Sequence, residues 1–280
     1  MTRGIPTNGT QELIGATYRL DDPTAILLRN SARRQRWGYL GAEIAWYLEG
    51  SNSLEDIKAY APSYEKFSDD GLTLYGAYGM RGLSLASLVS LAAQIRESRE
   101  SRQYVIPIWR LNDRVAKTKD MPCTVALHFL LRGDLLYLST FMRSNDLGTG
   151  FIYDVPCFCL MQQLVASSLG VGLGYYTHMV GSLHIYDRDR EKLERALATP
   201  TTYHRWTDFN YQDANWLRSE FRHMRVGVPS NPATRAVVSD MGELYDYHRG
   251  SGLRRQDDTS EATVDPSTNC LLYTSDAADE

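Results

Sequence analysis

Two apolar runs joined by a short turn restrict the fold of this chain more than any other feature. CTVALHFLL at residues 123–131 and DLLYLSTFM at residues 134–142 are rich in aliphatic, aromatic and β-branched residues, as strands are. The tight turn Arg132-Gly133-Asp134 joins them. A third strand-like run, QYVIPIWRL at residues 103–111, precedes them. The pattern therefore predicts that the chain is built around a β-sheet.

Helices and further strands are predicted on either side of these runs. Gln11–Asp22 and GYYTHMVGSLHIY at residues 174–186 are expected to be strands, and GYLGAEIAWYLEG at residues 38–50 a helix closed by its last glycine. Loops are expected from there to about Arg81. The other expected elements are a helix with the core face Leu85, Leu88, Val89, Ala92 and Ile95, a buried helix over Asp154–Leu169 and a charged surface helix over Asp187–Leu197.

The chain divides by composition into three parts. Residues 1–200 are predicted to form one mixed α and β domain. Residues 201–250 are more polar and are expected to add peripheral helices at 213–224 and 231–249. Residues 251–280 have the composition of a disordered tail, and the closing stretch CLLYTSDAADE resembles translated sequencing-adapter sequence, so we expect part of this tail to be non-native.

Net charge and hydropathy limit the partners of the chain. The 280 residues carry a formal charge of −4, so an anionic ligand needs a local group of arginines, and long nucleic acid is not an expected partner. No run approaches the roughly 20 apolar residues of a membrane span, and the N-terminus has no signal-peptide core. The four cysteines are too few for a disulfide framework. A cytoplasmic protein with reduced thiols is expected.

One carboxylate lies in an unusually apolar setting. Asp154 is the only residue of a charged type in GFIYDVPCF, at residues 150–158. An unpaired buried carboxylate costs several kcal/mol or takes up a proton, so an acid in such a run usually has a partner. A bound ligand is one candidate partner. The alternative is a helix N-cap, because Asp154 opens an apolar helical run, and both roles can coexist.

Cys123 is a candidate nucleophile because Pro122 before it tends to place it at the rim of the sheet. An inert core thiol is the alternative. Cys157 and Cys159 form a C-x-C pair without matching ligands elsewhere, so helix packing is the better interpretation and no metal is expected.

Polar residues cluster in MRSNDLGTG at residues 142–150, at the end of a predicted strand. Arg143 and Ser144 suit a phosphate, and the glycines let the backbone approach a ligand closely. A solvated turn would have the same composition. His184 and Tyr186 lie two apart on a later strand and therefore share a face.

Read together, these segments resemble the active-site segments of the thymidylate synthase family. MPC (121–123), MRSNDLGTGFIYD (142–154) and GSLHIY (181–186) follow in the family's order and spacing. Residues 42–50, 77–81 and 100–104 are similar to its glutamate helix, tyrosine loop and subunit-crossing arginine segment, so the resemblance covers about Gln11 to Asp189. It implies an α+β thymidylate synthase-like fold, in which a mixed sheet is covered by helices and packs across an obligate homodimer.

The resemblance also implies a role for each matching residue. Cys123 would be the nucleophile, and Glu43 would order water and move protons. Tyr78 would join that water network, with Tyr75 as the alternative. The resemblance implies that the 5′-phosphate is bound by Arg143, Ser144 and the second subunit's Arg102, and the sugar by His184 and Tyr186. The folate would contact Asp146 and Gly150, and the base would contact Asp154.

The implied chemistry is one-carbon transfer from 5,10-methylenetetrahydrofolate to C5 of a pyrimidine nucleoside monophosphate. A thiolate at Cys123 would add to C6 and make C5 nucleophilic, and Arg143 nearby would favour the thiolate. Glu43 and Tyr78 would handle protons.

Asp154 replaces the Asn of synthases that act on deoxyuridylate. A carboxyl group can accept from cytosine N4 and, with a shared proton, donate to N3, whereas a carboxylate repels uracil O4. Such an Asp marks the family's cytidylate hydroxymethylases, so the expected product is 5-hydroxymethyl-dCMP or 5-hydroxymethyl-CMP.

Departures from the family pattern keep two alternatives open. Thr124 and Gln103 stand where synthases usually have His and a second Arg, and only Arg3 could represent the N-terminal phosphate loop. One alternative is a thymidylate synthase that methylates dUMP, and the other is a dimeric nucleotide-binding relative without activity.

Overall fold

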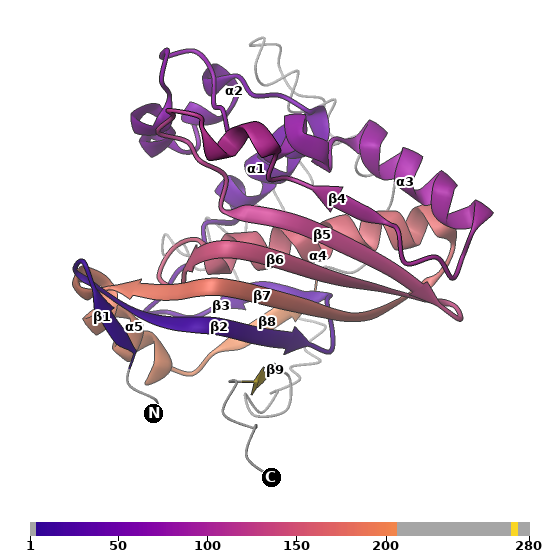
Figure 1. The fold of residues 1–280 in the computed structure, drawn as a ribbon. Coiled ribbons are helices and arrows are strands. Elements are labelled where there is room, and N and C mark those ends of the chain that lie inside the picture. Colours follow the sequence, from indigo (N-terminus) through magenta and orange to yellow (C-terminus); the bar gives the residue numbers. More distant parts are fainter. Residues whose placement is uncertain (1–3, 206–269, 274–280) are drawn as a thin grey trace, which may run out of the picture.

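The computed structural model describes residues 4–205 and 270–273 of the chain. Its main element is a mixed sheet, in which β6 and β7 are parallel and all other pairs are antiparallel. In spatial order the sheet consists of β1 (Ile5–Thr7), β2 (Thr10–Leu20), β7 (Gly172–Tyr186), β6 (Leu135–Asp146), β5 (Thr124–Arg132) and β4 (Val105–Pro107), with β9 (Cys270–Tyr273) paired to β2 (Figure 1).

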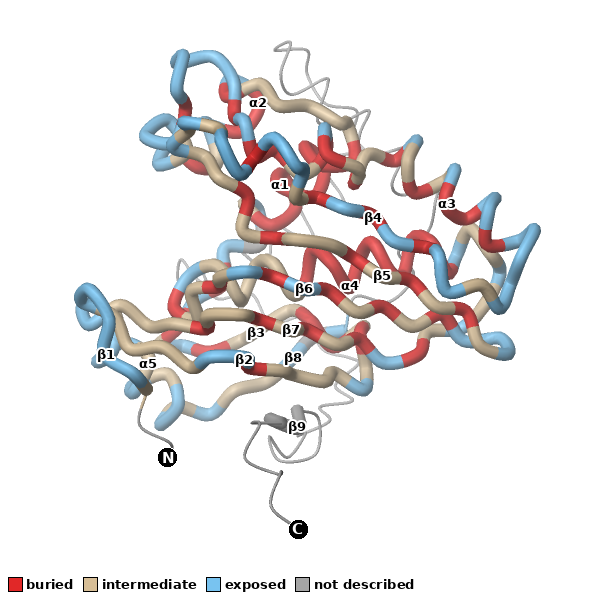
Figure 2. Tube along the Cα trace, in the orientation of Figure 1, coloured by how far each residue is buried: buried red, intermediate tan, exposed pale blue. Residues whose placement is uncertain are grey.

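Three helices form the layer behind the sheet in the view of Figure 1: α1 (Trp37–Glu49), α3 (Leu85–Glu97) and α4 (Phe151–Leu169). Helix α4 is buried on all sides over residues 156–166, which explains its nearly uninterrupted apolar sequence (Figure 2). A second, two-stranded sheet pairs β3 (Ala25–Arg29) with β8 (Thr202–Arg205). The remaining helices are α2 (Leu54–Lys58) and α5 (Arg190–Leu197), and four short helical segments are η1 (Pro62–Phe67), η2 (Gly79–Leu83), η3 (Leu111–Arg114) and η4 (Asp187–Asp189).

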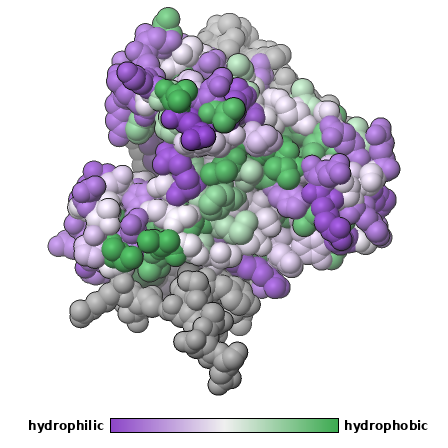
Figure 3. All heavy atoms as spheres, in the orientation of Figure 1, coloured by the Kyte–Doolittle hydropathy of each residue, from purple (hydrophilic) through white to green (hydrophobic). Residues whose placement is uncertain are grey.

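Alternation along β6 separates the two faces of the sheet. Leu136, Leu138, Thr140 and Met142 are buried against the helices, whereas the residues between them point to the other face. Phe141 is 41% exposed on that other face. Figure 3 shows hydrophobic residues gathered over the middle of this face, which no helix of the described residues covers.

The structure confirms the predicted sheet and its main helices, with two corrections. Helix α4 begins at Phe151, after Gly150, and the backbone N–H of Asp154 already donates to the carbonyl of Gly150 at 2.9 Å. Asp154 is therefore inside the first turn, and its interpretation as an N-cap is wrong. The segment expected to be loops up to Arg81 contains α2, η1 and the start of η2.

Strand β8 opens the range 201–250, where we expected peripheral helices, and β9 lies in the expected tail. The two helices predicted at residues 213–224 and 231–249 lie outside the described residues. Among the helices that are described, none combines the length and the apolar composition needed to cross a membrane.

Candidate active site

Cys123 and Arg143 lie side by side at the ends of neighbouring strands. Cys123 immediately precedes β5, and its carbonyl accepts from the backbone N–H of Arg143 at 2.8 Å. The Arg143 guanidinium donates from Nε to the carbonyl of Pro122 at 3.0 Å, and its Nη2 lies 3.7 Å from Cys123 Sγ. Antiparallel pairing of β5 with β6 thus places a positive charge against the thiol.

Two opposing influences act on the Cys123 thiol. Burial raises its pKa above the ordinary 9.0, and the positive charge of Arg143 lowers it, with burial the larger of the two. Nearby Asp154 and Asp120 raise it further. We predicted that Arg143 favours the thiolate, and its effect has that direction, but Cys123 remains a protonated thiol at neutral pH. Activation therefore requires a base or a change in its surroundings.

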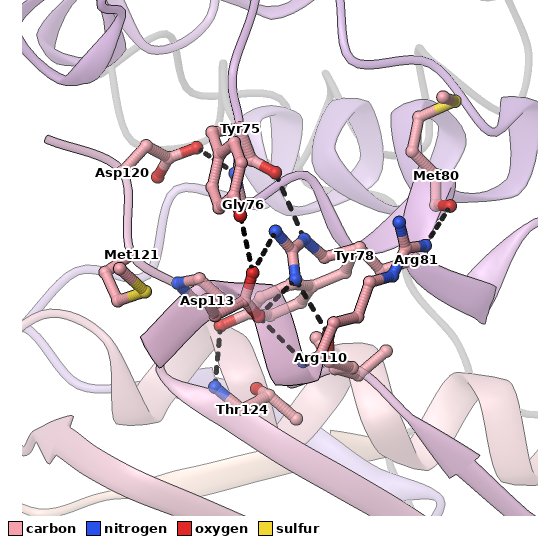
Figure 4. Close-up of polar contacts among 12 residues, drawn as sticks. Tyr75, Gly76, Tyr78, Met80, Arg81, Arg110, Asp113, Asp120, Met121 and Thr124 are labelled. Atoms are coloured by element: carbon pink, nitrogen blue, oxygen red, sulfur yellow. Dashed lines mark hydrogen bonds and ion pairs between the residues drawn. The ribbon is translucent and has the colours of Figure 1, made fainter. Parts of the chain in front are cut away.

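Tyr78 is the tyrosine that lies beside the segment of Cys123. Its hydroxyl oxygen accepts from the backbone N–H of Thr124 at 3.2 Å, next to Cys123 (Figure 4). Tyr75 instead donates to Asp113 Oδ1 at 2.7 Å (Figure 4). The structure therefore separates the two candidates and brings only Tyr78 to the segment of Cys123.

The tyrosine loop is held by a buried ion pair. Arg81 Nη1 lies 2.7 Å from Asp113 Oδ2, and both side chains are almost fully buried. Arg81 also donates to the carbonyls of Tyr75 and Ile108 (Figure 4). Burial would raise the pKa of Asp113, but hydrogen bonds from Arg81, Arg110 and Tyr75 outweigh it and hold the pKa at about 2.

Glu43 lies at the centre of a buried polar network. It is 4% exposed on α1, and the hydroxyls of Tyr39 and Tyr64 each lie 2.6 Å from its Oε1. Cys157 Sγ lies 3.7 Å from its Oε2. Burial raises the pKa of Glu43, and the hydrogen bonds from the tyrosines lower it in part. A carboxyl group with a raised pKa is suited to move protons near neutral pH.

Asp154 is partly buried on the first turn of α4 and has an abnormal pKa. Burial raises this pKa well above 3.8, the negative charge of Glu43 adds to the rise, and a hydrogen bond with Asn145 opposes it. None of these influences comes from a cation. These surroundings favour the protonated form of Asp154, which has one O–H donor and one C=O acceptor.

The polar end of β6 meets the end of β7. Ser144 Oγ lies 3.5 Å from His184 Nδ1, and the rings of His184 and Tyr186 pack edge to face at 5.3 Å. Asp146 accepts from the backbone N–H of Gly148 at 2.7 Å and from the hydroxyl of Thr149. Parallel pairing of β6 and β7 brings these segments together although about 40 residues separate them.

Gly150 lies directly before α4, where a side chain would not fit. A Cβ atom there would lie 2.9 Å from Asn145 Oδ1 and 3.2 Å from Asp154 Oδ2. We predicted that Gly150 contacts a folate. The crowding by Asn145 and Asp154 is a second reason why this position requires glycine.

Arg102 lies apart from the other candidates. It precedes β4, and its carbonyl contacts His128 Nε2 at 3.1 Å. Within the described residues it forms no hydrogen bond or ion pair with another predicted site residue, and its contact with a phosphate bound in a second subunit stays a prediction. Arg3 lies outside the described residues.

Sequence reasoning missed Tyr39, Tyr64 and His178. Tyr39 precedes Glu43 by four residues on one helix, and this spacing could have identified it. Tyr64 and His178 come from segments distant in sequence, and only the fold brings them to Glu43 and Asn145.

Comparison with known proteins extends these observations. Deoxyuridylate hydroxymethyltransferase of Pseudomonas phage M6 is 30% identical over 193 residues, which are 64% of this chain and 55% of that protein. The protein of the same name from Delftia phage PhiW-14 is 25% identical over 209 residues, 70% of this chain and 58% of that protein. The chain thus spans little more than half the length of these relatives.

Solved structures show the fold. The thymidylate synthase from T4 phage has a TM-score of 0.59 at 20% identity, covering 67% of this chain and 72% of that chain. Thymidylate synthase A from Bacillus subtilis has a TM-score of 0.59 at 22% identity, covering 67% of this chain and 70% of that chain. The family model described as Thymidylate synthase matches residues 5–226. The chain therefore belongs to the thymidylate synthase family.

Proposed function

We propose that the protein transfers a one-carbon unit from 5,10-methylenetetrahydrofolate to C5 of dCMP or CMP, with addition of water, giving the 5-hydroxymethyl nucleotide and tetrahydrofolate. The observation that carries the proposal is the carboxyl group of Asp154 on the first turn of α4, beside Gly150, in surroundings that raise its pKa and favour its protonated form. Its O–H can donate to cytosine N3 while its C=O accepts from the N4 amino group. An ionised Asp154 would have two acceptors and would repel uracil O4.

Cys123 and Arg143 support the first step, addition of the thiol to C6 of the base. The sulfur forms a bond to C6, and C5 gains the electron pair with which it attacks the one-carbon unit. Because Cys123 is a protonated thiol at rest, a base must take its proton. Tyr78 contacts the residue next to Cys123, and we assign this proton transfer to Tyr78 together with the buried carboxyl group of Glu43.

Glu43 supports the later steps. After transfer, C5 loses its proton, and the electron pair of that bond forms a double bond from C5 to the CH₂ carbon while the bond from this carbon to the folate nitrogen breaks and tetrahydrofolate leaves. The exocyclic CH₂ on C5 is then open to attack. Water adds to this carbon, and the electrons of the ring expel the Cys123 sulfur from C6. Glu43 is a suitable acceptor for the proton of that water, because its burial and raised pKa leave it able to exchange a proton near neutral pH.

The remaining residues fit the rest of the nucleotide and the folate. Arg143 and Ser144 would bind the phosphate, together with Arg102 of a second subunit, and His184 and Tyr186 would bind the sugar. The folate supplies a methylene group at the oxidation level of formaldehyde. Asp146 fits an N–H donor of the pterin ring, because each of its oxygens keeps a lone pair beyond the bonds to Gly148 and Thr149. Gly150 leaves space beside it.

A second substrate is favoured by the names of the relatives. Two phage proteins similar to this chain are called deoxyuridylate hydroxymethyltransferases. With its proton on the other oxygen, the neutral Asp154 would accept from uracil N3–H and donate to O4. The second candidate is therefore dUMP, with the same chemistry at C5.

Product mass tests both candidates. The protein is incubated with methylenetetrahydrofolate and dCMP, CMP or dUMP separately, beside C123A and the control C159A. This control removes a buried thiol that forms no hydrogen bond with a proposed site residue in the described part of the chain. We expect a hydroxymethyl increment on a cytosine nucleotide with the wild type and C159A, and none with C123A. A hydroxymethyl increment on dUMP alone would establish the second candidate. A methyl increment on dUMP, or no product from a folded protein, would contradict hydroxymethyl transfer.

A further inference from the structure

The two carboxyl oxygens of Glu43 have unequal partners. The hydroxyls of Tyr39 and Tyr64 each lie 2.6 Å from Oε1 and donate to it. Among the described residues, Oε2 accepts only from the Cys157 thiol, whose Sγ lies 3.7 Å away. A hydroxyl is a good donor and a thiol a weak one, so Oε1 is the more strongly bonded of the two oxygens.

These contacts decide which oxygen of Glu43 can take up a proton. A carboxylate oxygen has about two lone-pair sites, and the two tyrosine hydroxyls occupy those of Oε1. A proton on Oε1 would force one hydroxyl to turn away and lose its bond. Because Glu43 is only 4% exposed, water would not replace that bond. A proton on Oε2 displaces only the weak bond from the thiol.

Oε2 is also the oxygen that faces α4. Cys157 follows Asp154 by three residues on this helix, and this spacing places their side chains on the same face. Helix α4 packs against α1, which carries Glu43. The negative charge of Glu43 raises the pKa of Asp154, in agreement with this placement. A proton on Oε2 is therefore on the side of Glu43 where Asp154 lies.

We propose that Glu43 takes up and returns its proton at Oε2, and that Cys157 is a positioning residue that donates to this oxygen when Glu43 is ionised. When Oε2 carries the proton, its O–H takes the place of that bond and the thiol hydrogen loses its acceptor. The inference rests on the proposed function in one respect, namely that Glu43 moves protons there. It adds the atom that does so and the residue that orients it.

Titratable groups from three elements face Glu43 and bear on any test by pH. They are Tyr39 and Tyr47 on α1, Tyr64 on η1, and Asp154 and Cys157 on α4. Burial raises the pKa values of the tyrosines and of Cys157 well above their ordinary values, so these groups keep their protons near neutral pH. Only the two carboxyl groups are left to change charge there, and E43Q separates one from the other.

The test is the S–H stretching band of Cys157, measured by infrared spectroscopy on the protein alone. This band is the one that C157A lacks, and protonation of Glu43 is followed by the carboxyl C=O band that E43Q lacks. We expect the S–H band to move to higher frequency as Glu43 takes up its proton, because the thiol hydrogen then loses its bond to a carboxylate. In E43Q the S–H band should keep one frequency over the same pH range.

A pH profile of kcat gives a second readout. C157A removes a donor to the ionised carboxylate, so the pKa of Glu43 rises and the acidic limb of the profile moves to higher pH. The matched control is C159A, which removes another buried thiol of α4, one that forms no hydrogen bond to Glu43 in the part of the chain that the structure describes. It should leave the profile and the Cys157 band as they are in the wild type.

The outcomes separate this inference from the proposed function. A Cys157 band that stays in place while the Glu43 carboxyl band titrates overturns the inference, and so does a band that moves equally in E43Q. A Glu43 band that does not titrate near neutral pH overturns it as well, since no proton would then be exchanged. Equal effects of C159A and C157A would show a general effect of packing. Because the spectra need no turnover, absence of one-carbon transfer contradicts the proposed function alone.

Discussion

At the level of single residues, the thiol of Cys123 shows how burial and charge compete. Arg143 lowers the pKa of the thiol, and burial raises it by more. In R143Q only burial and the negative groups remain, so the thiolate fraction must fall. Because Arg143 is exposed, we expect alkylation by iodoacetamide at pH 8 to slow by up to about fivefold, which corresponds to about 1 kcal/mol.

The control for this prediction is R99Q, which removes the same charge from a residue bonded to exposed Asp134. Alkylation of Cys123 should be unchanged in it. Equal rates in R143Q and the wild type would mean that the guanidinium does not act on the sulfur.

Glu43 allows a prediction about pH. The hydroxyl of Tyr64 donates to Glu43 and lowers its pKa, against the larger rise that burial causes. Y64F removes this donor, so the pKa of Glu43 must rise. If catalysis needs ionised Glu43, the acidic limb of the kcat profile moves to higher pH and activity at pH 7 falls. Y104F, whose hydroxyl bonds to carbonyls of Gln94 and Ser98, should leave the profile in place.

The candidate reactive residues could be proposed from the sequence because their motifs are short and local. Cys123, Arg143 and Asp154 were proposed in this way, and the structure brings them close to one another. Their buried surroundings could not be predicted, because Tyr64 and His178 reach the site only through contacts between distant segments. The pKa of Cys123 was likewise not predictable, since it depends on burial.

At the level of elements, the ion pair between Arg81 and Asp113 ties the tyrosine loop to the segment before β5. Removing one partner of a buried pair leaves the other charge uncompensated. We expect D113N to lower the free energy of unfolding by about 3 to 5 kcal/mol, measured by urea denaturation at pH 7. The matched control D134N breaks an exposed pair with Arg99 and should cost at most about 1 kcal/mol.

The same pair has a defined pH dependence. The pKa of Asp113 is about 2 in the folded protein, against an ordinary value of 3.8. Its stabilisation is therefore complete above the ordinary pKa and is lost as the pH falls through the folded value. The difference in stability between wild type and D113N should accordingly shrink between about pH 4 and pH 2. A difference that is constant over this range would contradict the assignment.

Elements with strong periodicity were predictable, and their boundaries were less so. The start of α4 was misplaced because Phe151, Ile152 and Tyr153 have no polar capping residue before them, and Asp154 looked like one. The short helices between residues 54 and 83 were missed because five or six residues do not establish a helical period. Within the part of the chain that is described, β3 pairs with β8 alone, and such a two-stranded sheet has little signal of its own.

At the level of the whole molecule, the uncovered face of the sheet predicts the assembly. The described helices cover one face, and Figure 3 shows hydrophobic residues gathered over the other. Large apolar side chains of β6 and β7 remain exposed, among them Leu135, Phe141 and Tyr175. A soluble monomer rarely leaves such a contiguous apolar patch open. We therefore expect a homodimer, which would also bring Arg102 of a second subunit to the phosphate.

F141E tests this expectation. Phe141 is 41% exposed on the open face of β6, and a glutamate there would be buried without a partner in a dimer, at a cost of several kcal/mol. We expect the wild type to sediment as a dimer and F141E as a folded monomer with much weaker affinity for the nucleotide, since Arg102 could no longer reach it. L111E, which replaces an apolar residue that is 77% exposed on η3, should remain dimeric. If F141E stays dimeric, the subunits meet elsewhere; if it is monomeric but binds the nucleotide normally, Arg102 has no role across the interface.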